Sequence, residues 1–426
     1  MKYEGKTIVD AIYTKTNENN PLIEALPEKL DRLEFIKQTS YKPKKNFVAN
    51  DFDSKMNYLN SVRSFSHYFD YMYEVYSDIY DCIYTNYKTR NTYVFLTRNI
   101  QIEKQIFFLE SRTMALLGTP GIGKTSTIKK CLDFFPKMIS HTDYKDQKIY
   151  FKQIPYLMIE CPFDCSIKTL ATKIMAEIDA VAGTDYSDIN KGKFTLSAVS
   201  NYIEKMCSFF HFGVIVIDEI QNVVLTSIKM KQMRLLMKFL LSLSNSSHVS
   251  LLFSGTLDAD VLFESEDYLK RRTLGKRLLP LKDDRIYHEF IKELWQLQIV
   301  GDQFELTQSL IETLYEVSKG IPFYLVEIFI LLQKELLIAG KEKFSINEIK
   351  KVINKYNINV YPIKEEGISI SDFSGSLNAQ ETKRKRGRPV LQKNNDDIIN
   401  IYETSQDINA LIKKLEDFNM IERTGS

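Results

Sequence analysis

A glycine-rich loop that interrupts an apolar stretch near residue 118 most limits the folds open to this chain. Leu116–Pro136 reads LLGTPGIGKTSTIKKCLDFFP, so the loop separates an apolar run from a second segment with helical character. Glycines 118, 121 and 123 permit backbone conformations that side chains would block, and several N–H groups can therefore face one centre. A helix beginning near Lys124 adds its own free N–H groups and positive dipole end. The sequence predicts a strand, an anion-binding loop and a helix in succession.

The loop matches the phosphate-binding pattern G-x-x-x-x-G-K-[ST] without a mismatch. We expect Lys124 to neutralise the β- and γ-phosphates of ATP, and the Thr125 hydroxyl to ligate Mg²⁺. The alternative is a plain glycine turn between a core strand and a surface helix. The residues expected to bind nucleotide are Gly118, Thr119, Pro120, Gly121, Ile122, Gly123, Lys124, Thr125 and Ser126.

A second motif, GVIVIDEIQNV, supplies acidic groups at the end of another predicted strand. An apolar run from Val214 delivers Asp218 and Glu219 at its carboxyl end. Asp218 fits as a partner of the metal ion, and Glu219 is placed to polarise an attacking water. The alternative is an exposed strand end that merely carries acids. The two motifs together are more specific than either one alone.

Two further positions are candidates for roles around the terminal phosphate. In HVSLLFSGTLDAD, Ser254 and Thr256 follow the next strand and are expected to sense the γ-phosphate, although a simple turn is the alternative. Arg271 and Arg272 lie at a predicted helix end before the last strand. Either arginine can reach the nucleotide of a neighbouring subunit and stabilise charge in the transition state. The alternative is a solvated basic helix end.

Composition and charge exclude several classes of protein. A chain of 426 residues with 44% hydrophobic and 26% charged residues is typical of a soluble globular protein. The net charge is only +2, so any binding to nucleic acid requires local basic patches. Of the five cysteines, only Cys161 and Cys165 resemble a pair of metal ligands, and no second pair or nearby histidine completes a metal site. The pattern favours free thiols in a reducing compartment. No apolar run reaches ~18 residues and the start is not a signal peptide, so we expect a cytoplasmic protein that does not associate with a membrane.

Changes in pattern along the chain predict four regions. Residues 1–95 are rich in tyrosine, asparagine and lysine, and are expected to pack on the core or dock a partner. Residues 96–283 alternate strands and helices, which predicts an α/β domain with a parallel five-stranded sheet between helices. Residues 284–360 are expected to form a small helical lid, with Ser345 and Glu348 as a capping box. Residues 361–426 are expected to be a flexible basic tail with a short helical module.

The α/β region contains the elements that carry the motifs. The predicted strands are Thr113–Leu117, Tyr156–Glu160, Val214–Ile217, Ser250–Phe253 and Arg277–Leu281. Helices are predicted at Ile167–Ala182 and Met230–Leu243. Catalytic groups are expected at the carboxyl ends of the strands.

These motifs resemble those of the AAA+ superfamily, and more narrowly of the TnsC/TniB family of transposition-regulating ATPases. The narrower resemblance rests on NPLIEALP (Asn20–Pro27), GTPGIGKT (Gly118–Thr125), VIDEIQ (Val216–Gln221) and LWQLQ (Leu294–Gln298). It implies an ATP- and Mg²⁺-dependent ATPase that assembles as a ring or helical filament on double-stranded DNA. Such proteins connect a target-selector protein to the transposase, and hydrolysis controls disassembly. In SKGIPFYLVEIF, Phe323 stands where many AAA+ lids carry an arginine, which implies slow turnover.

Two regions are candidates for contact with DNA. Lys168 and Lys173 are five residues apart, so they project about 140° apart around a helix and do not both face one pore squarely. The tail segment ETKRKRGRPVLQK is a more specific candidate for DNA binding than the two lysines, and its candidate contacts are Arg384, Arg386 and Arg388. Arg-Gly-Arg-Pro within it resembles the core of an AT-hook, whose arginines enter a narrow minor groove. The alternative is an unspecific basic linker that binds phosphates or an acidic partner.

Two other functions remain open from the sequence. One is an initiator- or loader-type AAA+ ATPase in replication or defence. The other is a scaffold protein that nucleotide stabilises, in which a docking surface is the working part.

Overall fold

The computed structural model describes much of the chain between residues 8 and 358. The described ranges are 8–14, 18–48, 51–88, 90, 112–187, 195–224, 230–264, 273–300, 305–341 and 345–358. All belong to the first of the two units into which the chain divides, Met1–Phe373. Within these ranges, no helix combines the length and the apolar character needed to cross a membrane.

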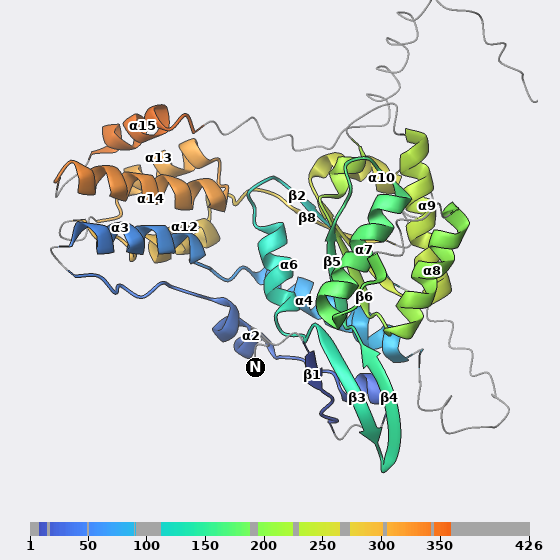
Figure 1. Cartoon of the computed structure of the whole chain (residues 1–426). Coiled ribbons are helices and arrows are strands. Elements are labelled where there is room, and N and C mark those ends of the chain that lie inside the picture. The colour runs from blue at the N-terminus through green and yellow to red at the C-terminus, as the bar shows by residue number, and fades with distance from the viewer. Residues whose placement is uncertain are drawn as a thin grey trace, which may run out of the picture. The chain divides into compact units, whose positions relative to one another are not determined.

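A five-stranded, all-parallel sheet lies at the centre of this unit (Figure 1). In spatial order its strands are β5 (Tyr156–Glu160), β6 (Val214–Asp218), β7 (Ser250–Gly255), β2 (Thr113–Gly118) and β8 (Thr273–Leu278). This confirms the predicted α/β fold with five parallel strands. β5 has the predicted bounds, and β2, β6 and β7 begin where predicted and extend slightly further.

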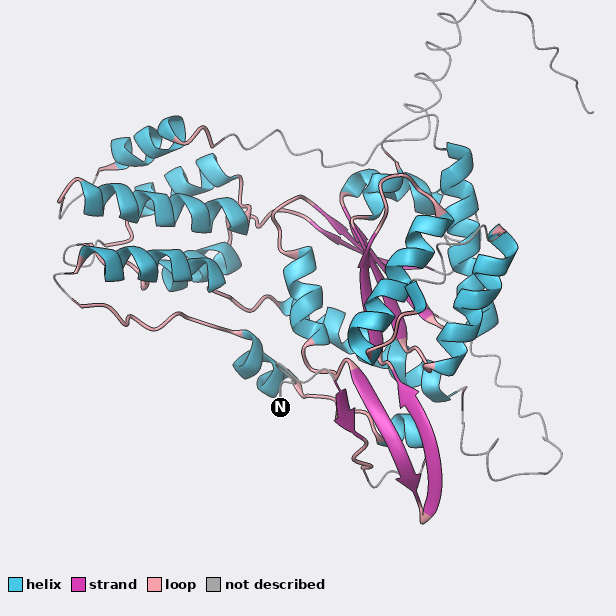
Figure 2. Cartoon of the chain, in the orientation of Figure 1, coloured by secondary structure: helices cyan, strands magenta, loops and turns pink. Residues whose placement is uncertain are grey.

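Helices cover both faces of the sheet (Figure 2), and successive residues of β2, β6 and β7 pack in two different hydrophobic cores. On one face, Leu116 of β2 packs in a core with α4 (Asp70–Lys88) and α6 (Lys124–Leu132). On the other face, Leu117 packs in a core with α7 (Ile167–Ala182), α8 (Leu196–Phe209) and α9 (Met230–Ser247). Because both faces are covered, the strands β2, β6 and β7 are almost continuously apolar instead of alternating with polar residues.

The last strand lies earlier in the chain than the sequence predicts. We expected Arg277–Leu281, but β8 spans Thr273–Leu278 and pairs with β2. Pro280 has no N–H group for a sheet, and the Leu281 N–H instead donates to Gly320 O at 2.9 Å. The apolar residues after Leu278 were therefore wrongly assigned to the strand. They begin the connection to the helical part of the unit.

Helix α4 brings the N-terminal residues into the core of the α/β part. From Tyr73 onward its tyrosines recur every three or four residues, so several lie along one side of the helix. The rings of Tyr76 and Tyr80 lie 6.3 Å apart, and those of Tyr80 and Tyr84 lie 6.4 Å apart. The fully buried Tyr87 donates its hydroxyl to His211 O at 2.8 Å. The sequence analysis noted this aromatic composition but assigned no helix here.

A second, three-stranded sheet is an element that the sequence analysis did not predict. β3 (Met138–Tyr144) and β4 (Gln147–Gln153) form an antiparallel hairpin, and β1 (Ile8–Asp10) pairs in parallel with β3. The hairpin turns at Lys145 and Asp146, whose φ angles are 48° and 64°. Tight hairpin turns require positive φ and usually contain glycine or asparagine, so this turn lacks the usual sequence signal.

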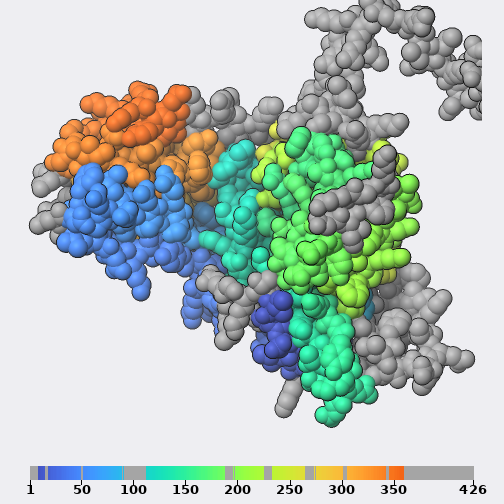
Figure 3. Space-filling model, viewed as in Figure 1, coloured from blue at the N-terminus to red at the C-terminus, as the bar shows by residue number. Residues whose placement is uncertain are grey.

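The described residues after β8 form four helices: α12 (Arg285–Trp295), α13 (Gln308–Ser318), α14 (Pro322–Ile338) and α15 (Ile346–Lys355). The capping box of Ser345 and Glu348 at the start of α15 is confirmed. An N-terminal helix, α3 (Phe52–Ser61), packs beside α14, as the blue and orange surfaces of Figure 3 show. The short helices α1 (Pro21–Glu24) and α2 (Arg32–Thr39) both pack against α4.

Gly320 provides a test of how the helical part is joined to β8. Gly320 and Gly340 both have positive φ, 70° and 59°, but only a Cβ at Gly320 would collide with backbone, at Leu281 O. We expect Gly340→Ala to lower the free energy of unfolding by about 1 kcal/mol through φ alone. Gly320→Ala should lower it by about 3 kcal/mol, because the connection must also shift. Urea denaturation of both variants measures the difference, and equal losses would contradict this account of the junction.

Candidate nucleotide-binding site

The phosphate-type loop lies between β2 and α6, and its glycines are there for identifiable reasons. A Cβ at Gly118 would collide with Leu278 of the neighbouring β8. Gly121 and Gly123 have φ angles of 82° and 99°, which side chains disfavour. Gly123 occupies the N-cap of α6, so the helix begins at Lys124 as predicted. The start of α6 directs backbone N–H groups and a positive dipole end toward the loop.

Lys124 is partly buried and folds back onto its own loop. Its ammonium group donates to Gly118 O at 2.8 Å and to Thr119 O at 3.1 Å. Burial lowers the pKa of Lys124, while the nearby negative charges of Glu219 and Asp218 oppose that shift. The lysine therefore carries its charge in a confined space beside two carboxylates.

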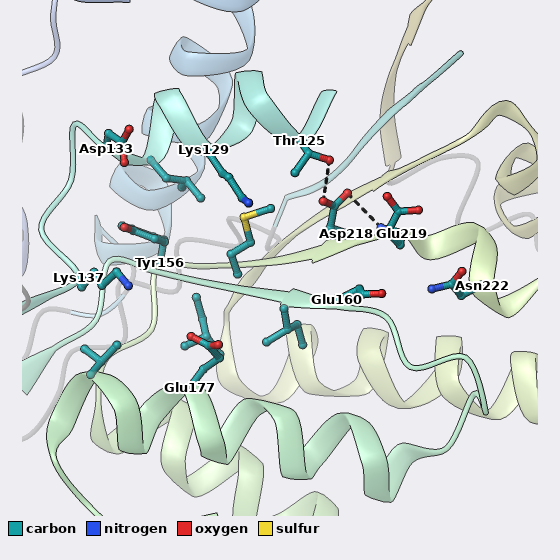
Figure 4. Close-up of a pocket in the computed structure, with 15 residues that line it drawn as sticks. Thr125, Lys129, Asp133, Lys137, Tyr156, Glu160, Glu177, Asp218, Glu219 and Asn222 are labelled. Carbon is teal, nitrogen blue, oxygen red and sulfur yellow. Dashed lines mark hydrogen bonds between the residues drawn. The ribbon is translucent and has the colours of Figure 1, made fainter. Parts of the chain in front are cut away.

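Thr125 and Asp218 join the two motifs. The Thr125 hydroxyl donates to Asp218 Oδ2 at 2.8 Å, and Figure 4 shows the two side chains pointing toward each other. Asp218 is buried at the end of β6, with 6% of its surface exposed, and its other oxygen accepts the Glu219 N–H at 3.0 Å. A hydroxyl and a carboxylate side by side are oxygen donors of the type that Mg²⁺ prefers. This donor set therefore fits the expected metal ion.

Glu219 follows Asp218 with a backbone φ of 56°, an uncommon value for a residue with a side chain. One of its carboxylate oxygens, Oε2, accepts a hydrogen bond from Gln221. Glu219 lines the cavity next to the loop and also a groove along β5. Its carboxylate therefore lies where both openings meet.

A cavity of about 650 Å³ adjoins the loop and is lined by three parts of the chain. Besides loop residues, it includes Phe65, His67, Phe69 and Tyr71 before and within α4, and Phe290 of α12. The His67 and Phe69 rings lie 4.9 Å apart, and each lies within 6 Å of the Phe290 ring. The sequence analysis did not identify these aromatic residues, and the only signal for Phe65, His67, Phe69 and Tyr71 was the tyrosine-rich composition of residues 1–95.

A second opening reaches the carboxylates from the other side. It is a groove of about 840 Å³ that runs along all five residues of the edge strand β5, between α6 and α7 (Figure 4). Thr125, Asp218 and Glu219 line one end of it. Lys129 of α6 and Glu177 of α7 line the groove further along.

The two candidates near the end of β7 occupy different environments, and Ser254 lies within the strand and not after it as expected. Thr256 lines the cavity, whereas Ser254 is fully buried and its hydroxyl has no hydrogen-bond partner among the described residues. Of the expected nucleotide-binding residues, Pro120 to Ser126 all line the cavity. Arg271 and Arg272 lie outside the described residues.

The start of α14 lies on the loop. The Phe323 N–H donates to Gly121 O at 3.3 Å, and a Cβ at Gly121 would come within 3.0 Å of Ile321 and 3.1 Å of Phe323. Phe323 is half-exposed and lines the cavity. Arg63 also lines the cavity. Its guanidinium group forms a two-point ion pair with Glu327 of α14, with N–O distances of 2.6 and 2.8 Å.

The predicted DNA contacts are spread between described and undescribed residues. Lys168 is exposed at the start of α7, whereas Lys173 donates to Glu160 O at 2.9 Å. Arg384, Arg386 and Arg388 lie outside the described residues.

Comparison with known proteins identifies the α/β part. Residues 110–263 match the family model described as an AAA domain. The comparison with curated proteins found no match. Among solved structures, the chain is similar to a Walker-type ATPase of Pyrococcus abyssi, with 14% identity, a TM-score of 0.37, and 73% of this chain and 86% of that chain covered. It is also similar to Cdc6p from Pyrobaculum aerophilum, with 14% identity, a TM-score of 0.36, and 74% and 82% covered.

The family match covers the loop, both carboxylates and four of the five strands of the parallel sheet. The candidate loop and carboxylates therefore lie in an α/β fold with a five-stranded parallel sheet, in the part of the chain that matches an AAA domain.

Proposed function

We propose that this chain binds ATP with Mg²⁺ and hydrolyses ATP to ADP and phosphate. The observation that carries the proposal is the hydrogen bond from Thr125 to Asp218, between residues 93 positions apart in sequence. It places the loop that fits phosphates next to the carboxylates that fit a metal ion and a catalytic base. This convergence is what distinguishes a nucleotide site from a glycine turn near an acidic strand end.

Each residue has a role that follows from its chemistry. The loop N–H groups and Lys124 bind the phosphates, whose charged oxygens attract the ammonium group more strongly than the carbonyls it now contacts. Thr125 and Asp218 hold the metal ion through oxygen. Glu219 accepts a proton from the attacking water, and bound ATP supplies the phosphoanhydride bond that is broken.

The aromatic part of the cavity is suited to the base of the nucleotide. Phe65, His67, Phe69 and Phe290 line a mostly apolar pocket that continues from the loop. A flat heteroaromatic base stacks on or against such rings, and most ligand pockets combine apolar walls with a few polar groups. Residues from the N-terminal part and from the helical part therefore complete the site in this proposal.

The narrower proposal is a regulator of transposition of the TnsC/TniB type. Its support is the set of sequence motifs that resemble this family. ATP-bound subunits would assemble as a ring or filament on double-stranded DNA, with Arg271 or Arg272 of one subunit reaching the nucleotide of the next. Lys168, Lys173 and the tail arginines would contact DNA, and the assembly would connect a target selector to the transposase.

One observation favours a second candidate, a scaffold that nucleotide only stabilises. Phe323 lies on the loop where an arginine would contact the phosphates, so the described lid residues bring no arginine from this position to the site. Hydrolysis separates the two functions, because a scaffold needs binding alone.

Glu219→Gln tests the catalytic role. Loss of the base should lower kcat about 100-fold or more while nucleotide binding persists. Lys124→Ala should instead weaken binding about tenfold or more, because a partly buried cation that pairs with phosphate is lost. Phosphate release and the fluorescence of a labelled ATP analogue measure the two effects. Glu289→Gln, the same change at an exposed ion pair with Arg285 on α12, is the control. Turnover in Glu219→Gln equal to that of the wild type would contradict the role of Glu219 as the base, whereas nucleotide binding without hydrolysis in the wild type would favour the scaffold.

Assembly on DNA tests the nucleotide switch. With a duplex at fixed salt, we expect large particles by light scattering with ATP or a non-hydrolysable analogue, and small particles with ADP or no nucleotide. Lys124→Ala should remain small under every condition, because it cannot hold the triphosphate. Assembly that is indifferent to nucleotide and to Lys124 would contradict a γ-phosphate switch.

Paired variants of the tail test how it contacts DNA. Arg386→Ala/Arg388→Ala and Lys383→Ala/Lys385→Ala each remove two positive charges, and each should reduce the salt dependence of binding by about two phosphate contacts. Only the arginine pair should abolish a preference for A·T-rich over G·C-rich duplex, because only it removes the minor-groove contacts. Fluorescence anisotropy at several salt concentrations measures both effects. Unchanged binding in both variants would assign the tail to a protein partner.

A further inference from the structure

We propose that Gln221 is a positioning residue that fixes the carboxylate of Glu219 and ties it to the loop after β7. The inference rests on the proposed hydrolytic function, in which Glu219 acts on water. It adds a residue that does not itself touch the reacting atoms and whose role the motif alone does not reveal.

The side-chain amide of Gln221 connects two elements that meet at the cavity. Gln221 lies in the short helix η3 (Ile220–Val223), directly after β6. Its Nε2 donates to Glu219 Oε2, and its Oε1 accepts the Thr256 N–H at 3.0 Å. Thr256 is the N-cap of the next short helix, η5 (Leu257–Ala259), which follows β7. One amide thus uses its donor end on the carboxylate and its acceptor end on the backbone of the adjacent strand's loop.

Gly255 leaves room for this bridge. A Cβ at residue 255 would lie 2.5 Å from Gln221 Oε1 and 2.8 Å from Ile220 Cγ2. Its backbone is not in the positive-φ region that demands glycine, so close approach is the reason that remains. Residue 255, at the end of β7, has no side chain where the Gln221 amide crosses the strand. A larger residue would push the amide away from Thr256 and from Glu219 together.

The bridge restricts a carboxylate that has few other constraints among the described residues. Glu219 lies at the meeting of two openings and is only partly buried, so its side chain would otherwise sample several rotamers. With Oε2 held by Gln221, the carboxylate stays near Lys124, where its charge opposes the lowering of the lysine pKa. A base that is held in place loses less rate to misplacement than a mobile one. Gln221 and Thr256 both line the cavity, so a ligand that contacts Thr256 also affects Glu219.

Three variants separate the two ends of the bridge. Gln221→Glu keeps an acceptor for Thr256 but loses the donor to Glu219 and adds a repelling carboxylate. Gln221→Met keeps the length and loses both hydrogen bonds. Gly255→Ala displaces the amide without changing it. Gln308→Glu is the matched control, because Gln308 donates in the same way to Glu312 on the surface of α13, at 3.1 Å.

Three measurements are made on the full chain: kcat and KM for ATP, affinity for a labelled ADP, and hydrogen exchange of the peptide containing Thr256 without nucleotide. We expect kcat to fall about tenfold or more in the three site variants, with KM and ADP affinity within about threefold of wild type. Exchange at Thr256 should rise in Gln221→Met and Gly255→Ala but stay low in Gln221→Glu. Gln308→Glu should match wild type in every measurement.

Several results would overturn the inference. An unchanged kcat in Gln221→Glu and Gln221→Met would show that Glu219 needs no partner, and a raised kcat would show that the bridge holds Glu219 back. A loss of ADP affinity as large as the loss of kcat would indicate a structural role only. If wild type binds no nucleotide or does not hydrolyse ATP, the proposed function fails instead. The exchange at Thr256 still reports on the bridge in that case.

Discussion

The candidate site depends on a constraint of parallel sheets, which is that all strands end at the same edge. β6 and β2 are not neighbours, because β7 lies between them. Thr125, after β2, nevertheless reaches Asp218 at the end of β6 with a hydrogen bond of 2.8 Å. β7 ends in Gly255, which has no side chain to obstruct the residues that pass over it from β6. The geometry of the sheet edge therefore determines which polar groups meet.

Packing around the loop involves three parts of the chain that are distant in sequence. Tyr71 of α4 donates its hydroxyl to Ile122 O at 3.4 Å, and Phe323 of α14 donates its N–H to Gly121 O at 3.3 Å. The loop is thus held from the N-terminal side and from the helical side. A phosphate that changes the loop also changes both contacts. In the proposed function, this arrangement would connect bound nucleotide to the helices on either side, as assembly that depends on ATP requires.

The N-terminal helices connect the α/β part to the helical part through their packing. α3 packs against α14 and α4 packs against α6, so the hydrophobic core continues from the sheet into the helical part. The two-point ion pair of Arg63 and Glu327 adds a charged link beside the cavity. Asn20, in one of the motifs that resemble TnsC/TniB proteins, caps α1 and donates to Tyr87 O at 2.8 Å. That motif has a structural role in this fold, whatever partner the protein binds.

Local patterns were enough to predict much of the α/β part, because strand apolarity, loop glycines and helix starts are short-range properties. Gly121, Gly123 and the start of α6 at Lys124 follow from the loop sequence, and β5 and α7 have the predicted bounds. The β3–β4 hairpin escaped prediction because Lys145 and Asp146 adopt positive φ without the usual turn residues. The end of β8 was misplaced because Leu281 is apolar for packing beside Gly320, not for pairing in the sheet. The aromatic wall of the cavity and the bridge through Gln221 arise from contacts between distant segments, and only the folded chain brings Phe69 to Phe290 or Gln221 to Thr256.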